Sequence, residues 1–182
     1  MRIDAQNNRL KVLAAANKLF MQFDVNHVTM AQLAEAAGVG VGTLYRNFPK
    51  KGDIVLALAY DQLDHYVAEQ QTYLEHRSVD LTAIRHVLAA YLKFRDHRQR
   101  LFPNGSLETA RRYYQRPEYQ QLAALFSQLI RGKHSNLTSM EVTFQADMLI
   151  AFLRNESYSL QREERGLTQT DILNLIMKMF FG

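Results

Sequence analysis

The residues best suited to chemistry lie in one short segment, VGTLYRNF, between residues 41 and 48. On a helix, which turns about 100° per residue, Leu44 and Phe48 fall on one side, and the opposite side carries small or polar residues. Hydrogen-bond donors on the free side of such a helix suit the phosphates and base edges of a DNA major groove. We therefore predict DNA contacts from Val41, Gly42, Thr43, Tyr45, Arg46 and Asn47.

Two helix starts are predicted to flank this surface. Thr29 has Gln32 three residues later, the spacing of a capping box, so a helix begins there. Gly38 ends that helix, because glycine adopts the left-handed C′ conformation without steric strain. Lys51 opens the helix after Pro49, where backbone amides and the helix dipole favour a phosphate. Two short helices joined by a glycine turn indicate a helix-turn-helix, with Thr29 and Lys51 as further phosphate contacts.

The same pattern has a structural interpretation. Amphipathic helix pairs with a glycine turn also occur in plain helical bundles, where residues 43–48 would form a solvated helix face. The pattern alone therefore leaves both DNA binding and a purely structural role open.

Composition limits the class of protein. The 182-residue chain is 47% hydrophobic, enough for a sizeable core, and its net charge of +4 and pI of about 9.4 are compatible with a polyanionic partner. It contains no cysteine, which excludes disulfides and thiolate metal sites. Its apolar runs are far shorter than the ~18 residues of a membrane span, and its N-terminus lacks the apolar core of a signal peptide. We expect a cytoplasmic protein with no membrane partner.

Periodicity predicts an all-α fold of about nine helices. The chain has only 3 prolines and 8 glycines, and β-branched alternation is scarce. An N-terminal three-helix helix-turn-helix head (1–52) is expected to join, through the fourth helix, a C-terminal bundle for ligand binding and dimerisation (53–182). We predict helices at about 5–23, 29–37, 41–48, 51–76, 80–101, 106–114, 117–131, 138–158 and 171–181. The face of the first helix that packs on the second should comprise Leu10, Leu13, Ala14, Asn17, Phe20 and Met21.

Residues 10–58 resemble the DNA-binding head of the TetR family of bacterial transcription regulators. The resemblance is carried by AAxxLF at residues 15–20, TMxxLAxxAGV at 29–39 and GTLYxxFPxK at 42–51, and the last run is highly specific. It implies phosphate contacts for Thr29, Thr43, Tyr45 and Lys51, and base or groove contacts for Val41, Gly42, Arg46 and Asn47.

Two residues depart from the family pattern. Gly40 stands where members often carry a serine cap, so the reading helix should begin weakly. Asp24 stands where a glycine usually ends the first helix, and aspartate tolerates the left-handed conformation at some cost.

The C-terminal helices predict a homodimer. The last helix is apolar nearly all round, and such a helix must be buried on every side. We expect one face on the core and another on a second subunit, which suits a pseudo-palindromic operator, although a plain core helix is the alternative. The predicted interface residues are Met148, Ala151, Phe152, Leu173, Ile176, Met177 and Phe180.

A ligand pocket is expected among aromatic residues in the middle of the chain, although most of these residues also suit a core. The predicted lining comprises Tyr66, Tyr91, Phe94, Phe102, Tyr113, Phe126 and Phe152. The stretch from Arg85 to Arg116 holds eight basic and two acidic residues, which indicates either an anionic effector or, in preference, a solvated surface. We predict no metal site, because Asp61, His65 and Glu69 at helical spacing better fit a solvated face.

No catalytic constellation is visible, so neither enzymatic activity nor a cofactor is predicted. The leading hypothesis is a sequence-specific DNA-binding transcriptional regulator, a repressor released from double-stranded operator DNA by an unknown small-molecule effector. The alternative is a helical ligand-binding or sequestering protein that lacks specific operator recognition, for which the weak helix start at Gly40 is the support.

Overall fold

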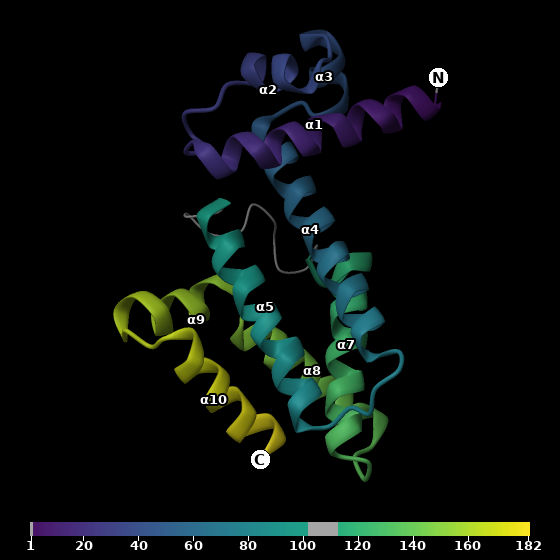
Figure 1. Cartoon of the computed structure of the whole chain (residues 1–182), viewed down its shortest axis with the longest axis vertical. Helices are drawn as coiled ribbons and strands as arrows, with labels where there is room; N and C mark the ends of the chain where they lie inside the picture. Colours follow the sequence, from purple (N-terminus) through teal and green to yellow (C-terminus); the bar gives the residue numbers. More distant parts are fainter. Residues whose placement is uncertain (1, 102–112) are drawn as a thin grey trace. The chain divides into compact units, whose positions relative to one another are not determined.

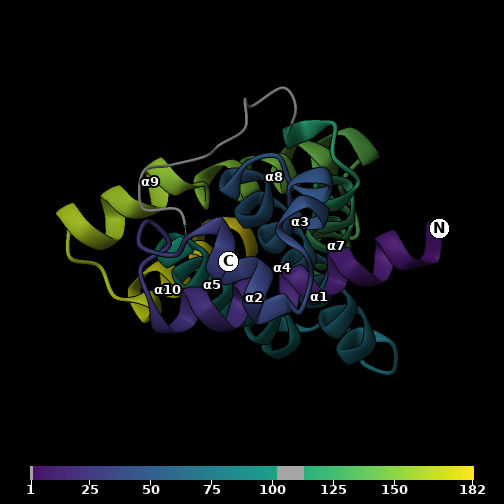
Figure 2. The ribbon, with the colours of Figure 1, turned by 90° about the horizontal axis from the view of Figure 1, so that it is seen from above.

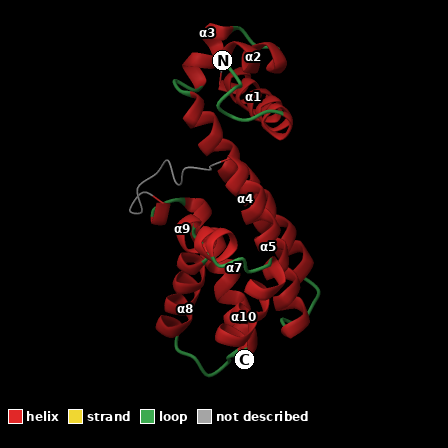
Figure 3. Cartoon of the chain, turned by 90° about the vertical axis from the view of Figure 1, so that its left-hand side faces the viewer, coloured by secondary structure: helices red, strands yellow, loops and turns green. Residues whose placement is uncertain are grey.

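All regular structure in the described residues, 2–101 and 113–182 of a computed structural model, is helical (Figure 3), as predicted. The helices, labelled in Figure 1, are α1 (Arg2–Gln22), α2 (Met30–Ala37), α3 (Val41–Asn47), α4 (Lys51–Leu74), α5 (Leu81–Leu101), α7 (Pro117–Lys133), α8 (Ser139–Phe152), α9 (Asn155–Ser159), the π-helix η1 (Leu160–Glu164) and α10 (Gln169–Phe181). No helix in these ranges is both long and apolar enough to cross a membrane.

The chain forms two compact units that meet within α4, between Gln62 and Leu63. The first unit contains the helix-turn-helix, and the second contains the C-terminal helical bundle. The functional boundary at residue 52 stays a prediction.

The core of the first unit forms where α1 packs on α2 and α3. Val12, Ala16, Leu33 and Leu44 are fully buried there. The predicted face of α1 is partly wrong, because Leu10, Ala14 and Met21 are exposed. The buried stripe instead follows residues 12, 13, 16 and 20, which lie on one side at 3.6 residues per turn.

Local sequence signals set several helix ends as predicted. Capping boxes are present at Thr29, Thr138 and Thr168. Gly38 ends α2 in the left-handed conformation with φ of 64°. Pro117 occupies the first turn of α7, where its missing amide costs no helical hydrogen bond.

In the second unit α7 packs against α8, and α10 packs against α5 and α7. Figures 1 and 2 show α10 alongside α5. The prediction of one helix over 138–158 is wrong. Arg154 N–H bonds to the Ala151 carbonyl, three residues back, and the helix restarts when Tyr158 N–H bonds to the Arg154 carbonyl. The chain therefore turns after Phe152.

Smaller differences lie at other helix ends. The fourth helix ends at Leu74 rather than near residue 76, and α7 continues to Lys133, into the predicted loop. The predicted break at 102–105 lies outside the described residues, as does the predicted 106–114 helix apart from two helical residues, Tyr113 and Tyr114.

Candidate nucleic-acid interface

The predicted DNA-contact residues of α3 lie on a helix with one firmly buried side. Leu44 and, just after the helix, Phe48 are buried against the rest of the first unit. Val41 and Tyr45 are 47% and 48% exposed, which is high for large apolar side chains. Gly42 is open, with no atom within 4 Å of the position that a Cβ would take. One side of α3 is therefore packed in the first unit, and the opposite side is exposed to solvent.

Hydrogen bonds order the polar side chains of α3. Arg46 donates from Nη2 to Thr43 Oγ1 at 3.2 Å, and Asn47 donates from Nδ2 to the Thr43 carbonyl at 2.9 Å. Gly40 is the N-cap and makes no side-chain cap, as predicted. Its carbonyl nevertheless accepts from the amides of Thr43 and Leu44, so the helix begins in regular geometry.

Arg9 is a basic neighbour of this surface that the sequence did not indicate. Its guanidinium lies 4.6 Å from the centre of the Phe48 ring, an arrangement in which a cation is attracted to the aromatic face. Its position in α1 carries no local signal of this contact, because Arg9 and Phe48 are far apart in the sequence.

Thr29 and the start of α2 lie in a complete capping box. The Thr29 hydroxyl accepts from Gln32 N–H at 3.2 Å and donates to Gln32 Oε1 at 3.0 Å, and Thr29 N–H donates to the same oxygen at 2.8 Å. The first amides of α2, those of Met30 and Ala31, lack an intrahelical acceptor, as at any helix start. An anion at this end would therefore meet free amides next to an ordered threonine.

Lys51 has partners that the sequence did not indicate. Its ammonium donates to three carbonyls of the connection between α1 and α2: Val25 at 2.7 Å, Val28 at 2.9 Å and Asn26 at 3.1 Å. The phosphate contact predicted for Lys51 is untested, but its three N–H groups already have acceptors.

Asp24, in the same connection, is not left-handed; none of the described non-glycine residues has a positive φ. It instead forms a turn in which its carboxylate accepts from Asn26 N–H at 2.7 Å. Because the side chain supplies this acceptor, the chain leaves α1 without the glycine-like conformation.

A cleft of about 390 Å³ lies in the first unit, beside the start of α2. It is lined by Leu19, Phe23, His27, Val28, Gln32, Glu35 and Ala36. Two of these residues, His27 and Val28, belong to the connection that Lys51 holds. The cleft is open to solvent, and no sequence signal indicated it.

Four of the predicted pocket residues form one aromatic cluster in the second unit. The Tyr66 ring centre lies 5.4 Å from Tyr91 and 5.7 Å from Phe94, and Tyr91 lies 5.1 Å from Phe126. Burial raises the pKa of Tyr66, whose hydroxyl donates to the Val87 carbonyl at 3.0 Å.

The other described residues of the predicted pocket are Tyr113 and Phe152. Tyr113 packs instead with Tyr114 and Tyr119, and Arg154 lies over its ring at 4.9 Å. Phe152 is half-buried, and Phe102 lies outside the described residues.

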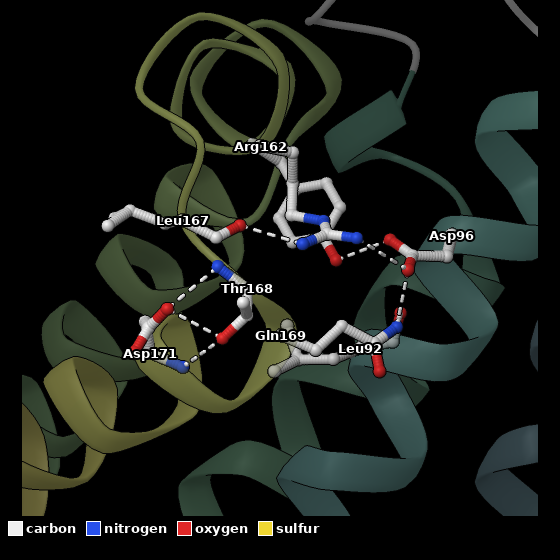
Figure 4. Close-up of polar contacts among 8 residues, drawn as sticks. Leu92, Asp96, Arg162, Leu167, Thr168, Gln169 and Asp171 are labelled. Carbon is white, nitrogen blue, oxygen red and sulfur yellow. Dashed lines mark hydrogen bonds and ion pairs between the residues drawn. The ribbon is translucent and has the colours of Figure 1, made fainter.

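Asp96 joins α5 to three later elements (Figure 4). Its carboxylate accepts from the Tyr158 hydroxyl and from Gln169 Nε2, each at 2.5 Å, and lies 3.5 Å from Arg162 Nη2. Arg162 also donates to the Leu167 carbonyl at 2.7 Å. Burial, and next the hydrogen bond to Asp96, raise the pKa of Tyr158. One carboxylate therefore fixes α9, η1 and the start of α10.

Two arginines of the basic stretch 85–116 have separate partners in the described residues. Arg85 donates to Asn174 at 2.6 Å, and Arg95 is buried with its guanidinium 5.9 Å from the Tyr158 ring centre. In the described part of the chain, no three histidine or acidic side chains converge as a metal site.

The predicted dimer residues divide by burial. Leu173 and Ile176 are buried in the chain's own core, whereas Ala151, Phe152, Met177 and Phe180 are half-buried and Met148 is exposed. Large apolar side chains that were not predicted are more exposed: Met140 at 80%, Phe144 at 62% and Met179 at 68%. The buried and the exposed sides of α8 and α10 are both apolar. Helical periodicity alone therefore did not show which residues are exposed.

Comparisons with known proteins agree with the helix-turn-helix interpretation. A family model described as bacterial regulatory proteins, tetR family, matches residues 12–58. A helix-turn-helix-type transcriptional regulator of Staphylococcus aureus is 26% identical over 181 residues, which cover 99% of this chain and 96% of that protein.

Solved structures share the fold at low identity. A TetR transcriptional regulator of a Rhodococcus species matches with a TM-score of 0.64 and 19% identity, over 95% of this chain and 96% of that chain. FadR of Thermus thermophilus, a TetR-family transcriptional repressor in complex with lauroyl-CoA, matches with a TM-score of 0.70 and 17% identity, over 94% and 92% of the two chains.

Proposed function

Because the chain belongs to the TetR family of bacterial helix-turn-helix transcriptional regulators, we propose that it is a repressor released from its operator by a small molecule. It binds double-stranded DNA in the cytoplasm as a homodimer. The observation that carries this proposal is the exposed face of α3, where Val41, Gly42, Tyr45 and Arg46 lie above a buried Leu44. No catalytic role or cofactor is part of the proposal.

On DNA, α3 enters the major groove. Arg46 and Asn47 reach base edges, Gly42 admits a close approach, and Val41 contacts a thymine methyl. Thr43 and Tyr45 bind phosphates through their hydroxyls, and the start of α2 binds another through Thr29 and its first amides. The phosphate contacts fix the orientation of α3, and the base contacts give sequence preference.

The dimer forms through α8 and α10. Met140, Phe144 and Met148 recur every four residues along α8, so they form one exposed apolar stripe. Leu175 and Met179 form a similar stripe on α10. Both helices pack on α7 by their other faces. Contiguous exposed apolar surface of this kind marks an interaction site, and a two-fold pair suits a pseudo-palindromic operator.

The effector binds in the second unit, beside the cluster of Tyr66, Tyr91, Phe94 and Phe126. Gln70 lies one turn after Tyr66 on α4 and is 5% exposed, yet its Oε1 has no hydrogen-bond donor among the described residues. A buried acceptor without a donor costs about 1–3 kcal/mol, which a donor group on a ligand would offset. The fold neighbour FadR, which holds lauroyl-CoA, makes acyl-CoA the first class to test.

Release requires a ligand that binds one conformation of the protein better than the other. Helix α4 contributes to both units, so a ligand that shifts α4 changes the spacing of the two heads in the dimer. The DNA then loses one of its two half-site contacts.

Selection of bound sequences from random DNA, followed by footprinting upstream of the protein's own gene, tests this function. A two-fold symmetric consensus and a matching footprint are expected. Adding lauroyl-CoA should release the protein from that site, and CoA alone serves as the control. Ligand binding without any preferred DNA sequence would instead support the sequestering protein, and a consensus unaffected by lauroyl-CoA would exclude that effector.

A further inference from the structure

Lys51 binds the connection between α1 and α2, residues 23–29, through its side chain. Its ammonium donates to the carbonyls of Val25, Val28 and Asn26 within 3.1 Å, although 23 to 26 residues separate the partners in the sequence. A lysine ammonium has three N–H groups, so these bonds occupy all of them. The side chain is half-buried, which limits the water that would otherwise replace a lost carbonyl.

The position of Lys51 in the helix explains why carbonyl acceptors around its ammonium are favourable. Lys51 is the first residue of α4, where the positive end of the helix dipole disfavours a cation. Three carbonyl dipoles directed at the ammonium offset that repulsion. A phosphate contact from the same ammonium would remove at least one of them, so such a contact exchanges one acceptor for another instead of adding one.

The connection leads directly to the start of α2, which is proposed to bind a phosphate. Within the connection, the Asp24 carboxylate accepts from Asn26 N–H at 2.7 Å and the Asp24 carbonyl accepts from His27 N–H at 3.0 Å. The next residue after Val28 is Thr29, whose capping box begins α2. The bond to the Val28 carbonyl therefore fixes the peptide unit that also contains the Thr29 amide.

We propose that Lys51 is a positioning residue for DNA binding, which sets the start of α2 for a phosphate and does not itself contact DNA. This inference rests on the proposed operator binding. It replaces one predicted direct contact by an indirect one, through Thr29.

Substitutions that separate charge from shape test this role. Lys51→Arg keeps the charge, but a planar guanidinium cannot direct three N–H groups from one nitrogen at three carbonyls. Lys51→Gln removes the charge. Lys50→Arg and Lys50→Gln are matched controls, because Lys50 is exposed and bonds to Asp53 through its backbone: its N–H donates to the Asp53 carboxylate at 2.9 Å, and its carbonyl accepts from Asp53 N–H at 3.0 Å. Circular dichroism at the assay temperature establishes that each variant is folded.

The salt dependence of operator affinity gives the first readout, between about 50 and 200 mM salt. Both Lys51 variants should bind about tenfold more weakly than the natural protein, with an unchanged slope of log affinity against log salt. If Lys51 contacts a phosphate, Lys51→Arg keeps its affinity, and Lys51→Gln lowers the slope by about 0.9 per subunit. That result overturns the proposal.

Phosphate ethylation interference gives a readout that general loosening of the fold would not produce. In Lys51→Gln, interference should disappear at the phosphates next to α2 and persist at those next to Tyr45 on α3. A double-mutant cycle of Lys51→Gln with Thr29→Ala should be non-additive, whereas the cycle with Arg46→Ala should be additive. Uniform loss of interference, or additivity with Thr29→Ala, contradicts positioning through α2.

Operator selection by the natural protein distinguishes a failure of the proposed function from a failure of the role proposed for Lys51. If it selects no operator at all, both the proposed function and this role are wrong. If it selects an operator and Lys51→Arg binds as the natural protein does, only the role of Lys51 is wrong.

Discussion

Arg46 is held by Thr43 one turn earlier on α3, through a hydrogen bond of 3.2 Å from Nη2 to Oγ1. Both residues are predicted DNA contacts, and the bond lies on the exposed face of the helix. A side chain that is already ordered loses less conformational entropy when it binds. In the proposed complex with DNA, Thr43 therefore orders Arg46 for a base edge in addition to making its own predicted phosphate contact.

Thr43→Val should lower both operator affinity and sequence preference at the base that Arg46 reads. Loss of one hydrogen bond of about 0.5–1.5 kcal/mol corresponds to roughly 2- to 12-fold weaker binding. Thr43→Ser keeps the hydroxyl and should bind as the natural protein does. Fluorescence anisotropy with the selected operator and its single-base variants measures both effects. A Thr43→Val protein with unchanged base preference would show that Thr43 does not orient Arg46.

Phe144→Glu should dissociate the proposed dimer. The phenylalanine is 62% exposed in the middle of the α8 stripe, so a charge there costs nothing in the single chain but must be desolvated in the interface. Sedimentation velocity should show a monomer, and operator affinity should fall as the second head is lost. Leu81→Glu, at an exposed leucine of α5, is the matched control and should stay dimeric. Monomeric natural protein, or a dimeric Phe144→Glu variant, excludes this interface.

Local rules predicted the helix-turn-helix from sequence, because each signal acts within a few residues. Thr29 and Gln32 form their cap within the first turn of α2, and Gly38 ends that helix because it adopts a left-handed backbone conformation. The burial of Leu44 and Phe48 follows from spacing on a single helix.

Contacts between distant residues could not be predicted in this way. The three carbonyls that hold Lys51, and the convergence of Tyr158, Arg162 and Gln169 on Asp96, depend on how helices pack. The turn after Phe152 also has no glycine or proline to mark it. Where both faces of a helix are apolar, as in α10, periodicity does not show which face is covered.

Asp96→Ala should destabilise the second unit by about 2–4 kcal/mol, because it removes a charged acceptor and leaves the buried Tyr158 hydroxyl without one. Asp96→Asn retains an oxygen for Tyr158 and loses the ion pair with Arg162, so about half of that effect is expected. Urea unfolding followed by circular dichroism measures the change. Equal effects of the two substitutions would mean that the ion pair, and not the tyrosine hydroxyl, dominates.

Gly40→Ser should stabilise the first unit by a few tenths of a kcal/mol, the usual advantage of serine over glycine at an N-cap. A Cβ at this position would have Thr43 Oγ1 as its nearest neighbour, at 3.9 Å, so the side chain fits without displacement. Hydrogen exchange of the first amides of α3 should slow. Gly40→Ala adds a Cβ without a cap oxygen and is the control. Faster exchange in the serine variant would show that glycine is required there for another reason.

The three capping boxes should respond differently to acid. Glu141 and Asp171 close the boxes of α8 and α10, and hydrogen bonds to the hydroxyl and the backbone amide of their threonine partners lower the pKa of each carboxyl. The stabilisation is therefore present above their ordinary pKa values of 4.5 and 3.8 and is lost as pH falls through the lowered values. In α2 the same position is Gln32, which does not titrate.

Hydrogen exchange of the first-turn amides, followed as pH falls below about 4.5, checks this difference. After correction for intrinsic exchange, protection should decrease at the starts of α8 and α10 and stay constant at α2. The exchanged variants Glu141→Gln and Gln32→Glu should reverse the behaviour of α8 and α2, because only the carboxylate gains a proton. Parallel loss of protection in all three boxes would show instead that acid unfolds the protein globally before any cap is protonated.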